Sequence, residues 1–442
     1  MRLRWKKPGF PAAAGCLLVA TLEAAPALAR APIDAGTAAM AVSASPAGML
    51  VPNDAGALGA TVDGLLAAGR QLSPQLRAAA LETEAAAAKA EAAGALEDPM
   101  FSENYQRYRS GGLFSMNFIT VTQTFPLWGK RNLRHRAALA EVDAARGRER
   151  AAQDELDEQI KVAYARYYAF TRAVAVNKEI AGLVRQMSHA AAIRYGQGGG
   201  DQAGVIQALT EETSAAAEGA RLEAERASAA ARLNALLARP VSAPLAEPLL
   251  LRPLPPVEPS MEALLARARG ANPTLLVNDA EVRGAQIQRR LAGKAWYPDL
   301  SVGAGPIVQT NAPTGVSATV GFTIPLQWGA KRAGEREAAA RLGAARERFG
   351  AAVASIEGAL GEALARLDAA RRIDELLRRQ TLPQAQAGFR SALAGYGQGR
   401  GDLAVVLAAE HRLHDTDLEL LRTETDEQAA LAAIERLIGG DL

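Results

Sequence analysis

The sequence contains little of several residue types, and each shortage excludes a class of protein. The single cysteine, Cys16, can form neither a disulfide within the chain nor a cysteine-based metal site. Aromatic residues make up only 5% of the chain while alanine is abundant, which favours long, close-packed helices over one large rounded core. The net charge of +2 gives no reason to expect a nucleic-acid partner.

A long apolar run is also missing after the N-terminal segment. Because a transmembrane helix needs about 18 or more consecutive apolar residues, the sequence predicts no such helix. If the protein lies in a membrane, we expect it there as a β-barrel, the other structure that satisfies all backbone polar groups within lipid.

The N-terminal segment has the features of a targeting sequence. Four basic residues among the first seven precede a mostly apolar stretch, and Ala27-Leu28-Ala29 fits a cleavage site of small residues. We expect residues 1–29 to be a signal peptide and residues 30–57 to be a flexible tail. Lipidation at Cys16 is the alternative, because the preceding Ala-Ala-Gly loosely resembles a lipobox.

The most informative feature of the sequence is an internal duplication. Four markers recur in the same order and at nearly the same spacing, which is far too long for a solenoid of short repeats. The markers are residues 61–76 and 260–275, the pairs Asp98-Pro99 and Tyr297-Pro298, the segments TFPLWGKR (124–131) and TIPLQWGAKR (323–332), and the turns YGQGGGD (195–201) and YGQGRGD (396–402).

This duplication predicts two pseudo-symmetric halves, residues 58–239 and 260–438, joined by a proline-rich linker at 240–259. Each half should contain a helix, two strands, a long helix, a glycine-rich turn and another helix. In the first half we expect helices at 61–95, 130–195 and 202–237, and strands near 100–105 and 114–125. In the second half we expect a first helix at 260–295 and strands at 300–308 and 316–324.

Periodicity supports these assignments. Residues 316–324 alternate between apolar and small polar side chains, which fits the wall of a membrane barrel and an ordinary amphipathic hairpin equally well. The long helices carry apolar residues at coiled-coil spacing and therefore need partner helices along their length. These residues are Leu156, Ile160, Ala163, Tyr167, Phe170 and Val174 in the first half, and Val353, Ile356, Leu360, Ala363 and Leu367 in the second.

No catalytic constellation is present in the sequence. His411 and His414 are close enough on a predicted helix to share a metal, but without a nearby cysteine or distinctive carboxylate pattern a solvated helix face explains them better. The acidic run at 154–158 is likewise expected on a solvated face. We therefore expect no enzyme activity, no cofactor and no metal site.

These markers together resemble the TolC-like outer-membrane efflux channels. Three doubled features carry the resemblance: Ser-Pro or Asn-Pro opening a helix that ends before a second proline, a strand followed by Pro-x-x-Gly and Lys-Arg, and the Tyr-x-x-Gly turn. The resemblance implies a mainly α fold with a small β part, in which a long α-helical barrel and a transmembrane β-barrel are shared by a trimer.

Within that family, LEDPM (96–100) followed by QTFPLWGKR (123–131) is most similar to the heavy-metal efflux branch. The resemblance implies a homotrimeric channel in the cell outer membrane with a periplasmic helical extension. Its implied partners are outer-membrane lipid, a periplasmic adaptor protein and a proton-driven inner-membrane pump of the resistance-nodulation-division type. Drug efflux and type I protein secretion are alternatives, and a periplasmic coiled-coil adaptor or scaffold is a more remote one.

The resemblance also assigns roles to residues. It assigns the residues of the glycine-rich turns to the adaptor-docking tips. It assigns the residues between each strand and the following long helix to strand-to-helix junctions near the lipid headgroups. The tip residues are Tyr195, Gly198, Gly199, Tyr396, Gly399 and Arg400, and the junction residues are Pro126, Gly129, Lys130, Arg131, Pro325, Gly329, Lys331 and Arg332. Asp201 and Asp402 follow the turns as expected helix N-caps and are candidate pore or gate residues, because rings of carboxylates favour cations.

Overall fold

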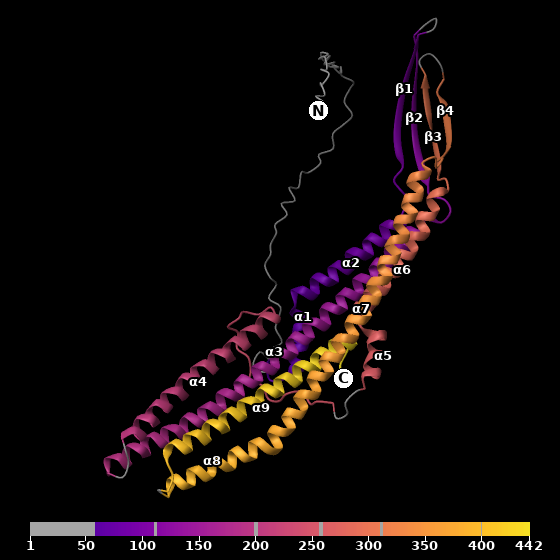
Figure 1. Ribbon diagram of the computed structural model, residues 1–442. Coiled ribbons are helices and arrows are strands. Elements are labelled where there is room, and N and C mark those ends of the chain that lie inside the picture. Colours follow the sequence, from indigo (N-terminus) through magenta and orange to yellow (C-terminus); the bar gives the residue numbers. More distant parts are fainter. Residues whose placement is uncertain (1–57, 110–112, 199–201, 256–259, 310–312, 399) are drawn as a thin grey trace, which may run out of the picture. The chain divides into compact units, whose positions relative to one another are not determined.

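The computed structural model describes residues 58–109, 113–198, 202–255, 260–309, 313–398 and 400–442, all within one compact unit, Val51–Leu442 (Figure 1). The expected signal peptide, the expected N-terminal tail and Cys16 lie outside these residues. So do three residues of the predicted tips, Gly199, Asp201 and Gly399.

Each half contains the expected order of elements, and the described chain is mainly α-helical with one small sheet. The first half comprises α1 (Val62–Leu72), α2 (Pro74–Gly94), β1 (Met100–Arg109), β2 (Leu113–Phe125), α3 (Lys130–Gly196) and α4 (Gln202–Leu236). The second comprises α5 (Met261–Ala271), α6 (Pro273–Gly293), the short η1 (Lys294–Trp296), β3 (Leu300–Gln309), β4 (Gly315–Phe322), α7 (Trp328–Leu376), the π-helical turn η2 (Leu377–Thr381), α8 (Leu382–Gly397) and α9 (Leu403–Ile438).

The helical segments expected at 61–95 and 260–295 each consist of two helices, and the second of each pair opens at the Ser-Pro or Asn-Pro pair. A proline restricts the residue before it to extended conformations, and Ser73 and Asn272 accordingly adopt ψ angles of 120° and 122°. Their side chains then cap the following helices. The Ser73 hydroxyl accepts a hydrogen bond from the Leu76 amide at 3.4 Å, and the Asn272 carbonyl oxygen accepts one from the Leu275 amide at 3.0 Å.

The four strands form one antiparallel sheet in the order β1-β2-β3-β4, so the two halves meet at the β2–β3 pair (Figure 1). The β2–β3 register is interrupted between the pairs Phe118–Ile307 and Val121–Ala304. Pro306, which has no amide N–H to donate, lies in this interval. The backbone of the neighbouring Gly305 approaches β2 so closely that a side chain there would collide with Ile119.

The helices bury the predicted coiled-coil positions. The long helix α3 packs on α2, α4, α6 and α9, while α7 packs on α6 and α9. Each half has its own apolar cluster near the middle of its long helix, and the predicted seam residues lie in or beside these clusters, except Phe170 and Val174, which belong to a third cluster with Leu222. The first cluster is centred on Leu65, Ile160, Tyr164, Leu233 and Leu237, and the second on Leu264, Leu360, Leu367, Ile434 and Ile438. No helix of the described residues is both long enough and apolar enough to cross a membrane.

Residues 240–255 of the proline-rich segment form neither helix nor strand. They run along the first half, where the Ala246 amide donates a hydrogen bond to the Leu58 carbonyl at 2.8 Å. The buried Tyr164 hydroxyl lies 2.9 Å from the carbonyl oxygens of both Ala60 and Leu250. This segment is therefore held against the first half by specific hydrogen bonds, including one to Tyr164 of α3.

Candidate functional site

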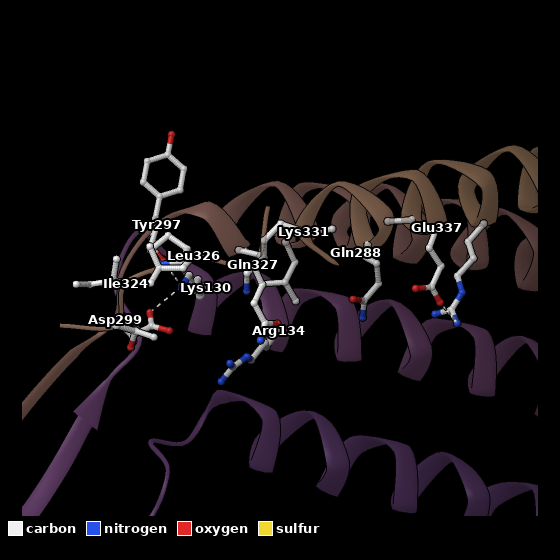
Figure 2. A pocket seen from close by; sticks show the side chains of 18 of the residues that line it. Lys130, Arg134, Gln288, Tyr297, Asp299, Ile324, Leu326, Gln327, Lys331 and Glu337 are labelled. Atoms are coloured by element: carbon white, nitrogen blue, oxygen red, sulfur yellow. Dashed lines mark hydrogen bonds and ion pairs between the residues drawn. The ribbon is translucent and has the colours of Figure 1, made fainter. Parts of the chain in front are cut away.

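The first strand-to-helix junction is built around Lys130. β2 ends at Phe125, and Gly129 adopts a left-handed conformation (φ 75°) that turns the chain into α3. The Lys130 ammonium is buried and donates to the Tyr297 carbonyl at 2.7 Å and to the Asp299 carboxylate at 2.9 Å (Figure 2). The same carboxylate accepts a hydrogen bond from the Leu127 amide at 3.2 Å, so Asp299 contacts the turn both before and after Gly129.

Asp299 was not among the sequence-predicted junction residues. It belongs to the second half, whereas Lys130 belongs to the first, so the contact joins the two halves across more than 160 residues. The duplication could not reveal it, because the corresponding position in the first half is Met100. The one available signal was a lone carboxylate at the start of an otherwise apolar strand.

The second junction has a different local structure. α7 begins at Trp328, so Gly329 lies inside the helix and does not turn the chain as Gly129 does. Lys331 lines an open cavity of about 980 Å³ together with Lys130, Arg134 and Glu337 (Figure 2). Arg131 and Arg332 are exposed, and Pro126 and Pro325 are half-buried. The junction residues therefore form one buried contact, around Lys130, and one solvent-facing group, around Lys331.

The first hairpin end is described up to Gly198. α3 ends at Gly196, and Gly198 follows in a left-handed conformation with φ 75°. Among the described residues, no atom beyond its two chain neighbours lies within 4 Å of the position that a Cβ of Gly198 would take. Tyr195, at the end of α3, is 48% exposed.

The second hairpin end is more tightly built. Tyr396 is half-buried against an apolar cluster, and the Arg194 guanidinium of the other hairpin lies 4.9 Å from its ring centroid. The exposed Arg400 donates its amide to the Gly395 carbonyl at 3.0 Å. The Asp402 carboxylate accepts a hydrogen bond from the Ala404 amide at 3.3 Å, so it caps α9 as expected. The two hairpin ends therefore touch through Arg194 and Tyr396.

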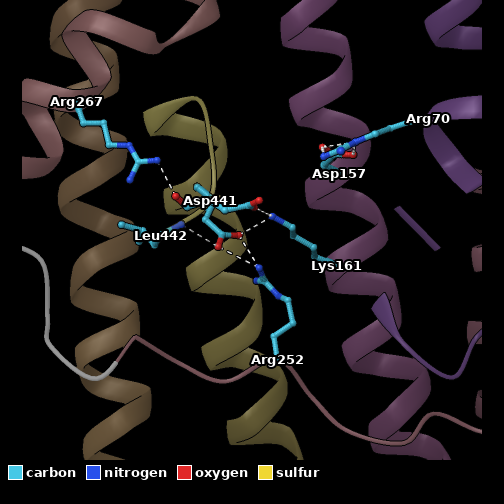
Figure 3. A network of polar contacts seen from close by, with 8 residues as sticks. Arg70, Asp157, Lys161, Arg252, Arg267, Asp441 and Leu442 are labelled. Carbon is cyan, nitrogen blue, oxygen red and sulfur yellow. Dashed lines mark hydrogen bonds and ion pairs between the residues drawn. The ribbon is translucent and has the colours of Figure 1, made fainter. Parts of the chain in front are cut away.

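A buried ionic network joins the two halves near the C-terminus (Figure 3). The Lys161 ammonium on α3 lies 2.8 Å from Glu435 on α9 and 2.5 Å from Asp441. Arg252 of the proline-rich segment also binds Glu435, at 2.9 Å. The hydrogen bond from Lys161 lowers the pKa of Asp441. The network therefore connects α3, α9, the segment between the halves and the end of the chain.

Part of the acidic run at 154–158 belongs to this region, so its assignment to a solvated helix face was wrong for two residues. Asp157 is buried and binds Arg70 of α1 at 2.6 Å, and this hydrogen bond raises the pKa of Arg70. Glu158 binds Arg436 of α9 at 2.6 Å. The sequence did show that residues 160–167 are mostly apolar, but nothing in it indicated that charged neighbours would be buried with them.

Helix α9 carries carboxylates whose pKa values are raised by burial. The pKa of Glu427 rises to about 7. Burial also raises the pKa values of Glu424, Asp417 and Glu410. Since an unfolded Glu427 loses its proton near pH 4.5, the native state holds more protons between about pH 4.5 and 7. This group therefore makes the fold less stable as the pH rises through that window.

Comparison with known proteins agrees with this architecture. The sequence pattern of a family described as outer membrane efflux protein matches residues 65–239 and again residues 264–440. No curated protein matches the sequence significantly.

Several solved structures share the fold. A membrane protein from Pseudomonas aeruginosa is 21% identical with a TM-score of 0.76, and the match covers 86% of this chain and 90% of that one. CusC, described in terms of folding and transmembrane channel formation, is 18% identical with a TM-score of 0.74 and coverages of 86% and 92%. The outer membrane protein VceC from Vibrio cholerae is 19% identical with a TM-score of 0.73 and coverages of 86% and 96%.

The structural matches show the fold alone, because their identities are low. The family match is independent of them, falls on both halves and spans most of each. It confirms the resemblance found in the sequence. The chain belongs to the outer membrane efflux protein family and is a transport protein, not an enzyme.

Proposed function

We propose that the protein is the outer-membrane channel of a tripartite efflux system that exports heavy-metal cations. In this proposal it works with a periplasmic adaptor and a proton-driven inner-membrane pump of the resistance-nodulation-division type. The observation that carries the proposal is that each half combines a strand pair with a long helical hairpin, while the four-stranded sheet has two open edges. The sheet would lie in the outer membrane and the helices would extend into the periplasm.

The open edges support assembly from three copies. β1 and β4 each pair on one side only, and four strands are too few to close a membrane barrel. The apolar face of β4 is exposed, with Val316 at 83% and Phe322 at 61%, and Met100 and Phe101 of β1 are exposed as well. Exposed apolar surface of this kind marks a contact with lipid or another chain. Three copies joined edge to edge would supply about a dozen strands, enough to enclose an aqueous lumen.

Light scattering tests this assembly directly. We expect the detergent-solubilised protein to have about three times the mass of one chain, which is 46.3 kDa before any processing. The scattering mass is corrected for bound detergent by recording absorbance and refractive index together. A stable monomer in mild detergent would contradict the shared barrel.

The hairpin ends are the proposed docking surface for the adaptor. Gly198 adds no side chain to the first turn, and no atom of the described residues beyond its chain neighbours occupies the place of its missing Cβ. At the second turn a Cβ on Gly401 would lie 2.9 Å from the Tyr396 amide nitrogen, so this turn also excludes side chains. The open position at Gly198 leaves the backbone of the first turn accessible, which would allow a partner hairpin to approach closely there.

Substitution of Gly198 tests docking. Gly198→Trp should abolish efflux while leaving the protein assembled in the outer membrane, because the indole would fill the open space that the adaptor needs. Gly198→Ala introduces the same left-handed strain, about 1–2 kcal/mol, without the bulk and serves as the control. The readout is resistance in cells that express each variant with the pump and adaptor. If the Trp variant gives full resistance, the adaptor does not dock at this turn.

Asp402, and Asp201 at the matching position of the first turn, are the proposed gate residues. Asp402 caps α9, and in a trimer the two positions would place six carboxylates around one end of the tube. Such a ring favours cations over anions. This role is compatible with capping, because one carboxylate oxygen can accept the backbone hydrogen bond while the other faces the pore.

The exported substrate is tested by deletion. A strain lacking this protein should accumulate zinc, cobalt or cadmium and lose resistance to it, while its drug resistance and protein secretion stay unchanged. Re-expression of the protein should restore the resistance. Loss of drug resistance alone would instead assign drug efflux, and loss of a secreted protein would assign type I secretion.

A further inference from the structure

One group of possible metal ligands lies away from the junctions and the ionic network. Glu211 on α4, and Glu410 and His411 on α9, each bring a ligand atom to within 4.8 Å of the others. The sequence had grouped His411 with His414, but the structure groups it with two carboxylates. One of these comes from the other half of the chain, which is why the spacing along the sequence could not reveal the cluster.

The imidazole of His411 has a defined orientation. Its Nδ1 lies 2.9 Å from the Leu407 carbonyl oxygen, which can only accept, so Nδ1 carries the proton and donates it. The other ring nitrogen, Nε2, lies 3.0 Å from the Glu211 carboxylate. In neutral imidazole this nitrogen has a lone pair, so a proton or a metal cation must lie between the two acceptors. A backbone carbonyl that fixes Nδ1–H is the usual support of a metal-binding histidine.

Glu410 provides a second, independent observation. Its side chain is only 4% exposed, and no hydrogen bond to its carboxylate is found among the described residues. Nδ1 of His411 lies 3.7 Å from this carboxylate, which is too far for a hydrogen bond, and its proton is already donated to Leu407. Burying a carboxylate that accepts no hydrogen bond is costly, and a bound cation would remove that cost.

The surroundings leave one side of the cluster dry and the other accessible. Ala208 and Leu407, about one helical turn from Glu211 and His411, belong to an apolar cluster that joins the two hairpins. The His411 side chain itself is half exposed, which leaves a path for an ion from solvent. A site of this kind has fixed ligands and an entry route.

We propose that Glu211, Glu410 and His411 bind one divalent transition-metal cation of the zinc type per chain. Two carboxylate oxygens and one imidazole nitrogen suit zinc, and three protein ligands leave the fourth position to water. The ion bridges α4 of the first half to α9 of the second and so fastens the two hairpins together. This site does not depend on which solute the channel exports.

Calorimetric titration tests the site. The full chain in detergent is stripped with a chelator and titrated with Zn²⁺, and the wild type should bind one ion per chain at this site. E211Q, E410Q and H411A should each weaken that binding by more than about tenfold, the effect that even an outer-sphere partner has at metal sites. Mg²⁺ should not compete, because it prefers all-oxygen ligands.

Two neighbouring substitutions serve as matched controls. Glu212 lies beside Glu211 but binds Arg185 at 3.4 Å, so E212Q should bind Zn²⁺ like the wild type. H414A removes the other histidine of α9 and should also have no effect. Thermal melts monitored by circular dichroism verify that every variant folds.

Hydrogen exchange provides a local readout that is independent of transport. Zn²⁺ should slow amide exchange in residues 202–215 and 403–415 of the wild type and not of H411A. The proposal is overturned if no saturable binding occurs, if the three ligand variants bind like the wild type, or if the two controls lose as much affinity. It is equally overturned if Mg²⁺ displaces Zn²⁺ from the site at similar concentrations. The same holds if H411A lowers the melting temperature but leaves Zn²⁺ binding unchanged, since His411 would then form only a protonated ion pair with Glu211.

Discussion

Replacing Lys161 with methionine is expected to destabilise the protein by about 3 kcal/mol, the lower end of the range for breaking a buried ion pair. The Lys161 side chain is 6% exposed and neutralises Glu435, which is equally buried, together with Asp441. Methionine fills similar volume but leaves Glu435 with one cationic partner, Arg252. That remaining partner is the reason to expect the lower end of the range.

The matched control is Lys178→Met on the same helix. The Lys178 ammonium lies 3.6 Å from Glu223 and its side chain is 66% exposed, so we expect a loss of less than about 1 kcal/mol. Thermal and urea melts of both variants, followed by circular dichroism in detergent, give the comparison. Equal melting of the two variants would show that the network does not stabilise the fold.

The second large effect is expected from Gly305→Ala in β3. The added methyl carbon would lie 2.8 Å from the carbonyl carbon of Ile119 and 3.1 Å from Cα of Thr120, and closer still to the Ile119 carbonyl oxygen. These are backbone atoms of β2, which is held between β1 and β3 and cannot retreat. We expect a loss of more than about 4 kcal/mol and failure of the β2–β3 pair, and therefore of the sheet that joins the two halves.

Gly315→Ala is the control, because a Cβ there meets Ile307 at an ordinary contact distance of 3.8 Å. Both variants are compared by the amount of protein recovered in the membrane fraction and by its resistance to trypsin. The Gly305 variant should be depleted and degraded while the Gly315 variant matches the wild type. Equal recovery of the two variants would mean that β2 can move aside.

The elements that could be predicted are those determined by local chemistry. Pro126 after an uninterrupted β-branched run ends a strand, and the heptad around Ile160 buries one face of a helix, so both followed from the sequence. The breaks at Ser73 and Asn272 were also local, since a proline follows each. The Ser-Pro and Asn-Pro pairs were recognised as helix openings in the sequence, although each was placed inside one helical segment.

The features that could not be predicted depend on contacts between distant residues. Lys130 was expected at a strand-to-helix junction and lies there, but nothing in the sequence indicated that its ammonium would be buried against Asp299 of the other half. Asp157 was expected in solvent, yet it binds Arg70. In the sequence, a charged residue that will be buried looks the same as one that stays in solvent. Only the packing of α1 and α9 on α3, and of β3 beside β2, decides which charges are buried.

The π-helical turn η2 has a consequence for how the second hairpin tolerates changes in length. Along α7, η2 and α8, the spacing between successive inward-facing residues does not alternate between three and four as it does in α3. Around η2 there are instead three successive spacings of four residues. These inward-facing residues are Ala370, Asp374, Leu377, Thr381, Ala385, Phe389 and Ala392. The wider π turn absorbs the extra residue, which in a plain α-helix would rotate everything beyond it by about 100°.

The turn therefore resets the phase of α8, so that Ala385 and Phe389 face α9 again and the Tyr396 end meets Arg194. A single residue deleted within 377–381 would convert the π turn to an α turn without displacing that end. The same deletion anywhere in α3, which has no such turn, would turn its hairpin end away from its partner.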